Sequence, residues 1–336
     1  METLTKEFEE ALTRVEVSGA RRLRAQEAHV EVRGVLEADA TLKGWGIDTV
    51  LIGSYARHTS IHPGKDVDVF SKLDSLDSQV SPTTVFNTMR SVLVEEYGNR
   101  AEAQDRSIKV LFDDHDGFSI DAVPAVHMAD RWGIPNRDTA AWEGDSKWTE
   151  TDPENLTSLT TDLNRRVLIS GRGAYVPIVK LVRQTRRFHL GDEKPGGLYF
   201  ELMTFWLFAG GLTADSWAEL FAVTLRGIHE ELKRAPDDPV NDPALQRPFE
   251  PKPDPSELAT ASDRFDKLAS KGEAALHLDE CAAAVQWRSI LGTNDRGQVF
   301  PLPDGCDDSG HRIAPIEAVT RRGSREASSF GNNRNV

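Results

Sequence analysis

Apolar positions along the first forty residues recur with the spacing of an α-helix. Phe8, Leu12 and Val15 fall on one face, Leu23 and Val30 continue the stripe, and Glu and Arg fill the positions between them. No proline interrupts this pattern, so it predicts one long helix over residues 1–39. The glycines that follow, in the stretch Lys43-Gly-Trp-Gly-Ile-Asp, end the helical pattern.

Short β-strand patterns come next. Residues 49–52 form a β-rich run that ends at Gly53-Ser54, and residues 66–70 alternate polar and apolar with a period of two. The remaining predictions in this region are a helix over 83–97 and a hairpin over 107–112 and 118–123, with the polar stretch 113–117 as its turn. Together these elements predict a mixed sheet with flanking helices.

From about residue 155 onward the pattern is helical. Candidate helices span residues 155–170, 174–189, 198–209, 214–233, 256–271 and 273–290. Residues 235–255 are rich in Pro and Asp, which indicates a long ordered loop or a crossover. The last residues, 321–336, have almost nothing to bury, so a disordered tail is expected.

These patterns place the chain in the α+β class. The predicted parts are an N-terminal spine helix (1–40), a sheet-containing core (41–155), a C-terminal helical domain (156–320) and a tail (321–336). A chain of 336 residues is long enough for about two domains with cores of their own.

Net charge and hydropathy exclude two classes of partner, long nucleic acids and membranes. With 40 Lys and Arg against 54 Asp and Glu, the net charge is −14, and an acidic protein is poorly suited to long nucleic acid. The N-terminus does not resemble a signal peptide, and the most apolar stretch (198–212) is too short to span a bilayer. We therefore expect a cytoplasmic protein without membrane association.

Two local features stand out from this composition. Cys281 and Cys306 are too few for a disulfide scaffold, and we expect one core thiol and one loop thiol in a reducing cytosol. Residues 163–191 contain no acid, which favours a local site for a small anion. The basic residues of this segment are Arg165, Arg166, Arg172, Lys180, Arg183, Arg186 and Arg187. Of the last three, at least two are expected on the solvated surface of a helix.

The densest chemical pattern runs from residue 53 to residue 68. A strand that ends in Gly53-Ser54 offers backbone N–H groups and a hydroxyl to a phosphate. Asp66 and Asp68 project from one face of the next strand, and carboxylates of this kind bind Mg²⁺ together with substrate phosphates. Asp121 lies among apolar strand residues, where a lone charge requires a partner such as a metal ion.

If the strands that carry these acids are neighbours, three carboxylates converge and suffice for two Mg²⁺ ions. Taken singly, each feature has a plainer interpretation. Asp66 and Asp68 alone would be a solvated strand face, and Asp121 alone a buried capping acid. The combination, in this order along the chain, favours metal-dependent phosphoryl transfer.

This order of motifs resembles the polymerase-β nucleotidyltransferase superfamily, and within it the CD-NTase family of bacteria. That family includes relatives of cyclic GMP-AMP synthase and of the oligoadenylate synthetases. Further matches are Asp121-Ala-Val-Pro124, Ile134-Pro135 with Trp148 and Thr151-Asp-Pro153, Val179-Lys180-Leu-Val-Arg183, and Trp287-Arg-Ser-Ile-Leu-Gly292. The resemblance covers about residues 1–300. It implies a polymerase-β-type mixed sheet with a long N-terminal spine helix and a C-terminal helical lobe.

The resemblance also implies roles for the matched residues. Gly53 and Ser54 would hold the donor triphosphate. The three acids, Asp66, Asp68 and Asp121, would bind two Mg²⁺ or Mn²⁺ ions, and Asp121 would help to deprotonate the acceptor hydroxyl.

The helical half supplies the remaining contacts in this interpretation. Lys180 would neutralise the β- and γ-phosphates. Relatives often carry a serine before the Y-x-x-E helix, but this chain has Gly196-Gly197, so the backbone N–H of Gly197 is the expected substitute. Gln104 and Arg106 precede the strand of Asp121, and we interpret them as a solvated strand edge rather than as part of the cleft.

The implied function is an enzyme that joins nucleoside triphosphates, ATP among them, into a short cyclic oligonucleotide and releases pyrophosphate. In the family it resembles, such a product activates a separate effector protein in anti-phage defence. Two alternatives stay open. One is an enzyme that adds nucleotides to an RNA end, as CCA-adding enzymes do, and the other is a catalytically silent nucleotide-binding protein.

Overall fold

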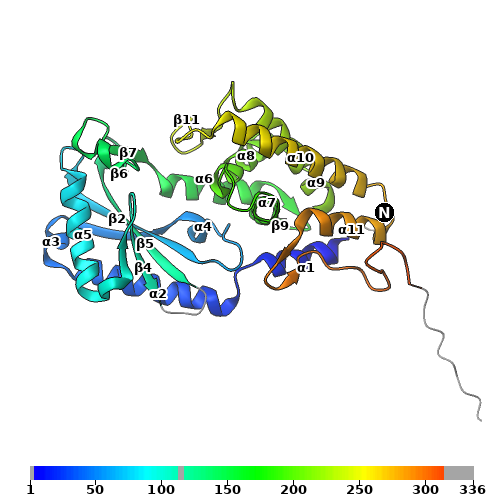
Figure 1. The fold of residues 1–336 in the computed structure, drawn as a ribbon, viewed down its shortest axis with the longest axis horizontal. Helices are drawn as coiled ribbons and strands as arrows, with labels where there is room; N and C mark the ends of the chain where they lie inside the picture. The colour runs from blue at the N-terminus through cyan, green and yellow to red at the C-terminus, as the bar shows by residue number, and fades with distance from the viewer. Residues whose placement is uncertain (1–3, 113–116, 314–336) are drawn as a thin grey trace, which may run out of the picture.

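The computed structural model describes residues 4–112 and 117–313. A mixed sheet with its helices forms one lobe and a bundle of helices forms the other (Figure 1), which is the predicted α+β architecture. The predicted disordered tail, and all of the predicted turn except Gly117, lie outside the described residues. The boundaries drawn between the four predicted parts stay a prediction.

The N-terminal region is broken into separate helices, so the prediction of one long helix was wrong. The helices are α1 (Thr5–Val15), α2 (Gly19–Ala38) and α3 (Ala40–Gly44). The chain is extended at Glu16 and Ser18, where Glu16 forms a β-bridge with Ile61 and the Ser18 hydroxyl accepts a hydrogen bond from the Arg21 backbone N–H. A serine at this position caps α2, which a continuous helix would not allow.

Because of this break, α1 packs in the helical lobe and α2 packs on the sheet lobe. Phe8 of α1 is fully buried in the helical lobe, where its ring meets those of Phe221, Trp287 and Phe300 edge-on at 5.0–6.3 Å. By contrast, α2 packs through residues such as Val32 on the core of the sheet. The N-terminal helices therefore connect the two lobes along one edge of the molecule (Figure 1).

The main sheet has seven strands in the order β1-β2-β5-β4-β3, with β6 on β5 and β7 on β6. The strands are β1 (Ile47–Ile52), β2 (Asp66–Asp77), β3 (Ala101–Ala103), β4 (Ile108–Phe112), β5 (Phe118–Met128), β6 (Arg131–Pro135) and β7 (Trp148–Thr151). Only the β2–β5 pair among these is parallel, so the sheet is mixed, as predicted. Val67 and Val69 of β2 are buried in the core under α2 and α5 (Pro82–Tyr97), so Asp66 and Asp68 face the opposite side.

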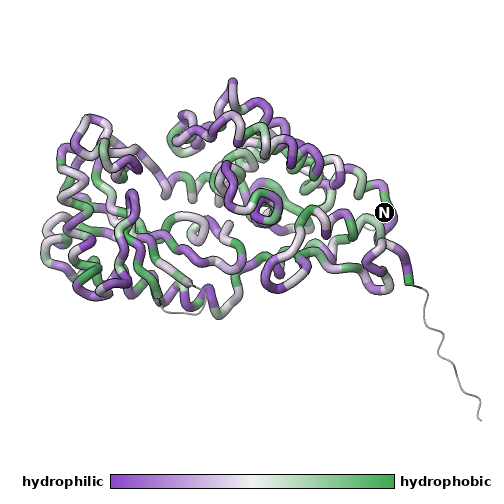
Figure 2. Tube along the Cα trace, viewed as in Figure 1, coloured by the Kyte–Doolittle hydropathy of each residue, from purple (hydrophilic) through white to green (hydrophobic). Residues whose placement is uncertain are grey.

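The second half is helical, as the periodicity predicts. Its helices are α6 (Pro153–Arg166), α7 (Tyr175–Leu190), α8 (Gly197–Ala209), α9 (Trp217–Arg234), α10 (Pro255–Ala275) and α11 (Glu280–Leu291). Hydrophobic and hydrophilic stretches alternate along them (Figure 2), as expected of amphipathic helices around one core. No helix within the described ranges is long and apolar enough to cross a membrane.

Short two-stranded ribbons follow α6, α9 and α11. They are β8 (Leu168–Ile169) with β9 (Arg172–Gly173), β10 (Asn241–Asp242) with β11 (Arg247–Pro248), and β12 (Thr293–Asn294) with β13 (Gly297–Gln298). The ribbon β10–β11 lies within the Pro-rich stretch, which is therefore an ordered loop.

The two cysteines form a disulfide, which contradicts the expectation of two free thiols. Cys281 at the start of α11 and Cys306 in the following segment have Cα atoms 5.3 Å apart, within the range that a disulfide spans. Their separation of 25 residues in the sequence hides this proximity, because the chain turns back after α11. The bond closes the segment after α11 onto the helical lobe.

Replacing Cys306 with serine is expected to destabilise the oxidised protein by about 3 kcal/mol, because an opened loop of this length gains entropy in the unfolded chain. Urea denaturation measures this difference in the free energy of unfolding. A reducing agent should lower the stability of the wild type to that of the variant. Equal stabilities under oxidising conditions would contradict a structural role for this bond.

Candidate active site

The junction between β1 and the short helix α4 (Gly53–Ala56) requires a glycine. Gly53 has a φ of +71°, in the left-handed region that favours glycine. A Cβ atom built on Gly53 would lie 1.9 Å from Oδ2 of Asp68, far inside van der Waals contact. The backbone of the predicted phosphate loop therefore packs directly against a predicted metal-binding carboxylate.

The sheet brings the three predicted acids to adjacent strands. Asp68 on β2 is the register partner of Asp121 on β5, and Asp66 is the partner of Ser119. The carboxylate of Asp66 accepts hydrogen bonds from the Ser119 hydroxyl at 2.8 Å and from the Lys109 ammonium at 3.4 Å. Parallel pairing of β2 with β5 thus brings together acids that are more than fifty residues apart in the chain.

Burial of these carboxylates disfavours their charged forms. It raises the pKa of Asp68 to about 6, an effect that Arg57 opposes and the negative charge of Asp66 reinforces. Burial likewise raises the pKa of Asp121 to about 7; Lys109 opposes this shift and the other two carboxylates add to it. The Oδ1 atom of Asp121 is buried and has no hydrogen-bond partner in the structure.

These features test whether the acids suit a divalent cation. A donor set of carboxylate oxygens with an unpartnered buried oxygen and raised pKa values fits Mg²⁺ or Mn²⁺, which would supply the missing positive charge. Within residues 4–112 and 117–313, however, no three Asp, Glu, His or Cys side chains are already gathered closely enough to hold a metal. Asp66 is held by Ser119 and Lys109 instead, so its side chain must leave them to join a metal site.

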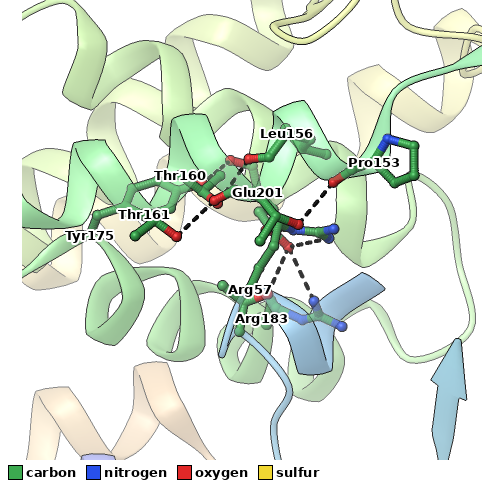
Figure 3. Close-up of polar contacts among 10 residues, drawn as sticks. Arg57, Pro153, Leu156, Thr160, Thr161, Tyr175, Arg183 and Glu201 are labelled. Carbon is green, nitrogen blue, oxygen red and sulfur yellow. Dashed lines mark hydrogen bonds and ion pairs between the residues drawn. The ribbon is translucent and has the colours of Figure 1, made fainter. Parts of the chain in front are cut away.

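A buried ion network stands where the two lobes meet beside these acids. Arg57, at the end of α4, donates to Glu201 of α8 at 2.6 Å, and Arg183 of α7 donates to the same carboxylate at 3.3 Å (Figure 3). The Thr59 hydroxyl, from a third residue, donates to the same carboxylate at 3.1 Å. Burial alone would raise the pKa of Glu201, but the two arginines lower it below its usual value, so Glu201 is charged.

One cavity of about 410 Å³ contains part of the predicted site. Its lining includes Gly53, Ser54, Asp68 and Arg183 together with residues of the β10–β11 loop. Gly197 lies beside it, because a Cβ on Gly197 would be 3.7 Å from the Arg183 guanidinium. The structure thus places Gly53, Ser54, Asp68 and Gly197 near one another, with Asp66 and Asp121 on the adjoining strands.

Lys180 is not in this cavity. Its side chain is buried and pairs with Glu16 at 2.7 Å, and it lines a separate hollow of about 500 Å³ between α2 and α4. Arg183, one turn further along α7, lines the cavity together with Gly53, and its guanidinium group lies beside Gly197. The acid-free basic segment indicated that a cation of α7 binds an anion. It did not indicate which face of the helix meets the cavity, and therefore not which cation.

Arg106 also differs from its sequence interpretation. It lines the same cavity as Gly53 and Asp68, and its Nε atom is buried, so it is not part of a solvated strand edge. Gln104 is exposed and accepts a hydrogen bond from the Ser107 hydroxyl at 3.0 Å, as the surface interpretation predicts.

Comparison with known proteins gives this site a context. Residues 1–164 match the family model described as Second Messenger Oligonucleotide or Dinucleotide Synthetase domain. Over 213 residues the chain is 25% identical to a cyclic AMP-AMP-AMP synthase from Acinetobacter sp. (strain ATCC 27244 / 9458). That alignment covers 60% of this chain and 57% of the relative, so the chain spans little more than half of the relative's length.

Solved structures of low sequence identity share the fold. CdnC from E. coli MS115-1, solved with ATP, has a TM-score of 0.70 at 14% identity, covering 88% of this chain and 98% of CdnC. The CD-NTase CdnG from Bradyrhizobium diazoefficiens, in complex with GTP, has a TM-score of 0.67 at 16% identity, covering 85% and 94%. The cyclic AMP-GMP synthase DncV from Vibrio cholerae has a TM-score of 0.56 at 14% identity, covering 83% and 92%. The sheet lobe and the helical lobe therefore have the arrangement of these enzymes.

Proposed function

We propose that this chain, whose residues 1–164 match the model of the Second Messenger Oligonucleotide or Dinucleotide Synthetase domain, is a member of that family and joins nucleoside triphosphates into a short cyclic oligonucleotide with release of pyrophosphate. The observation that carries this proposal is the position of Asp66, Asp68 and Asp121 on adjacent strands. Asp66 and Asp68 follow Gly53 along the chain, and Gly53 lines the same cavity as Arg183.

In the proposed reaction, a ribose 2′- or 3′-hydroxyl attacks the α-phosphorus of a donor nucleotide. A new P–O bond forms, and the bond to the departing pyrophosphate breaks. The unpartnered carboxylate oxygen of Asp121 accepts the proton of the hydroxyl. A second attack of the same kind closes the ring.

Charge on the donor triphosphate requires cations. Gly53 and Ser54 bind its phosphates in this proposal, and Arg183 neutralises them from α7. Asp66, Asp68 and Asp121 would hold two Mg²⁺ or Mn²⁺ ions, which when bound would stabilise the charge on the attacking and leaving oxygens. ATP is proposed among the substrates, and a separate effector protein is proposed to bind the product in anti-phage defence in the cytoplasm.

Arg183→Ala is expected to lower kcat/KM for nucleoside triphosphates by about 10- to 100-fold, since it removes a charged hydrogen-bond donor to phosphate. Lys180→Ala is expected to leave kcat/KM nearly unchanged, because Lys180 lies outside the cavity and pairs with Glu16. Steady-state kinetics on both variants, with Arg183→Lys as the conservative control, measure the difference. A larger loss in the Lys180 variant would return the phosphate role to Lys180.

The proposal is tested by incubating the protein with all four NTPs and Mg²⁺ or Mn²⁺, treating the products with phosphatase and measuring their mass. Phosphatase-resistant oligonucleotides that are absent with Asp66→Ala/Asp68→Ala support it. A tRNA that is extended or shifted in a gel, in a salt-dependent way, would favour the RNA-end alternative. NTP binding without turnover of any substrate would favour the silent nucleotide-binding alternative.

A further inference from the structure

Two arginines that interact electrostatically line the cavity of Gly53. Arg106 follows β3, and Arg137 follows β6. Both line the cavity of Gly53 and Asp68, and both also line a neighbouring hollow of about 760 Å³. They therefore mark the place where the two hollows adjoin.

Arg106 is half-buried and Arg137 is exposed, and both side chains line the cavity. The structure records no ion pair for Arg106 or Arg137 with any residue of its described ranges, and the buried Nε of Arg106 has no hydrogen-bond partner. Burial lowers the pKa of Arg106, and the like charge of Arg137 lowers it further, while Asp105 opposes both. Two unneutralised cations thus face one cavity.

No acid of the described lining forms an ion pair with either arginine, and two of these acids are engaged with other groups. Glu150 pairs with Arg131 and with Arg247, each at 3.4 Å. Asp138 caps a short helix by accepting from the Ala140 backbone N–H at 3.0 Å. The positive charges of Arg106 and Arg137 are therefore available to bind an anionic ligand.

The charge decides between two chemical classes of ligand. A nucleobase is neutral, so it would accept hydrogen bonds but leave two adjacent positive charges uncompensated. A polyphosphate would satisfy the donors and neutralise the charge, and planar guanidinium groups match phosphate oxygens two at a time. A polyanion is therefore the ligand that this pair fits.

We propose that Arg106 and Arg137 bind the 5′-phosphates of the second nucleotide, the acceptor, while Gly53, Ser54 and Arg183 bind those of the donor. This inference rests on the proposed function, because only a reaction between two nucleotides brings two polyphosphates into one cleft. The pair would select a triphosphate-bearing acceptor and orient its ribose hydroxyl toward Asp121.

The test uses a donor that cannot act as an acceptor. A 2′,3′-dideoxynucleoside triphosphate is supplied as donor, and either a ribonucleoside triphosphate or the matching nucleoside is supplied as acceptor. For the wild type, kcat/KM should be about 10- to 100-fold higher with the triphosphate acceptor, the range expected for charged hydrogen bonds. In Arg106→Gln/Arg137→Gln this ratio should fall to near one while the KM of the donor stays unchanged.

Arg90→Gln is the matched control, because Arg90 is an exposed arginine on α5 without an ion pair among the described residues. It should keep the wild-type preference. A double variant that keeps the preference overturns the inference. A double variant whose kcat/KM for the nucleoside acceptor falls well below the wild-type value also overturns it, since that loss indicates recognition of the base or a structural role.

A binding measurement separates this inference from the proposed function. Calorimetry with inorganic tripolyphosphate and Mg²⁺ should find two sites on the wild type and one on the double variant. This result without oligonucleotide synthesis would overturn the proposed function and leave the polyanion site standing. One site on both proteins would overturn the site at Arg106 and Arg137 while leaving the proposed function intact.

Discussion

Asp121→Asn is expected to reduce oligonucleotide synthesis by about 10²- to 10⁴-fold, the usual contribution of a positioned acid or base. The amide has nearly the same shape as the carboxylate but accepts no proton from the acceptor hydroxyl and is a poor ligand for Mg²⁺. In metal-free buffer at pH 8 the same variant should be more stable than the wild type, by about 2 kcal/mol after allowance for solvent screening. Activity and stability therefore change in opposite directions.

The sign of the stability change follows from the raised pKa. The Asp121 carboxyl titrates near 3.8 in the unfolded chain and near 7 in the folded protein, so between these pH values the folded state binds more protons. The stability of the wild type in EDTA should therefore fall as the pH rises from about 4 to about 7 and then level off. The variant lacks this component, so the difference between the two proteins is greatest above pH 7.

Thermal unfolding from pH 5 to pH 8, with and without Mg²⁺, measures this effect. Mg²⁺ should stabilise the wild type and not the variant, because a ligand that binds only the folded state adds to its stability. Asp105→Asn, an exposed acid outside the proposed metal site, serves as the control. If Asp121→Asn were destabilising in EDTA at pH 8, the charged Asp121 carboxylate would not destabilise the folded protein, contrary to its burial and its unpartnered oxygen.

Glu201→Ala is expected to destabilise the protein by about 3–5 kcal/mol, the usual cost of removing one partner of a buried ion pair. The substitution leaves Arg57 and Arg183 buried side by side without a negative charge between them (Figure 3). Because Arg57 comes from the sheet lobe and Arg183 from the helical lobe, the loss also frees Arg183 from its position at the cavity. Synthesis should fall together with stability.

Glu201→Gln separates these two effects. The amide keeps the volume and one acceptor oxygen, so the variant should lose less stability than Glu201→Ala while still leaving two arginines without a counter-charge. Denaturant unfolding measures both variants, and Glu95→Gln on the exposed side of α5 is the control. A stability of Glu201→Ala within about 1 kcal/mol of the wild type, as for a surface substitution, would show that water replaces the network, contrary to its burial.

Local pattern in the sequence determined much of this protein. The alternation around Asp66 and Asp68 places both acids on one strand face, because successive side chains of a strand point to opposite sides. The helices of the second half follow from periodicity, and the confirmed α+β class follows from the order of these elements. The sequence indicates Gly53 by its position at the end of a strand. It does not indicate the close contact with Asp68 that requires a glycine there.

Other features were decided by contacts between distant parts of the chain. The break after α1 depends on packing of Phe8 in one lobe and of α2 on the other, which helical spacing alone does not reveal. The bond from Cys281 to Cys306 depends on where the chain turns after α11.

The rotation of α7 about its own axis determines which of its cations faces the cleft. Lys180 and Arg183 lie one turn apart on α7, and only the packing of α7 against α1 and α8 decides that Arg183 lines the cavity of Gly53 while Lys180 pairs with Glu16. Arg106 becomes a cleft residue in the same way, because β6 and the loop after it bring Arg137 against it. A sequence specifies which residues share a strand or helix face, but which neighbour that face meets is set by long-range packing, and the assembled cleft follows from that packing.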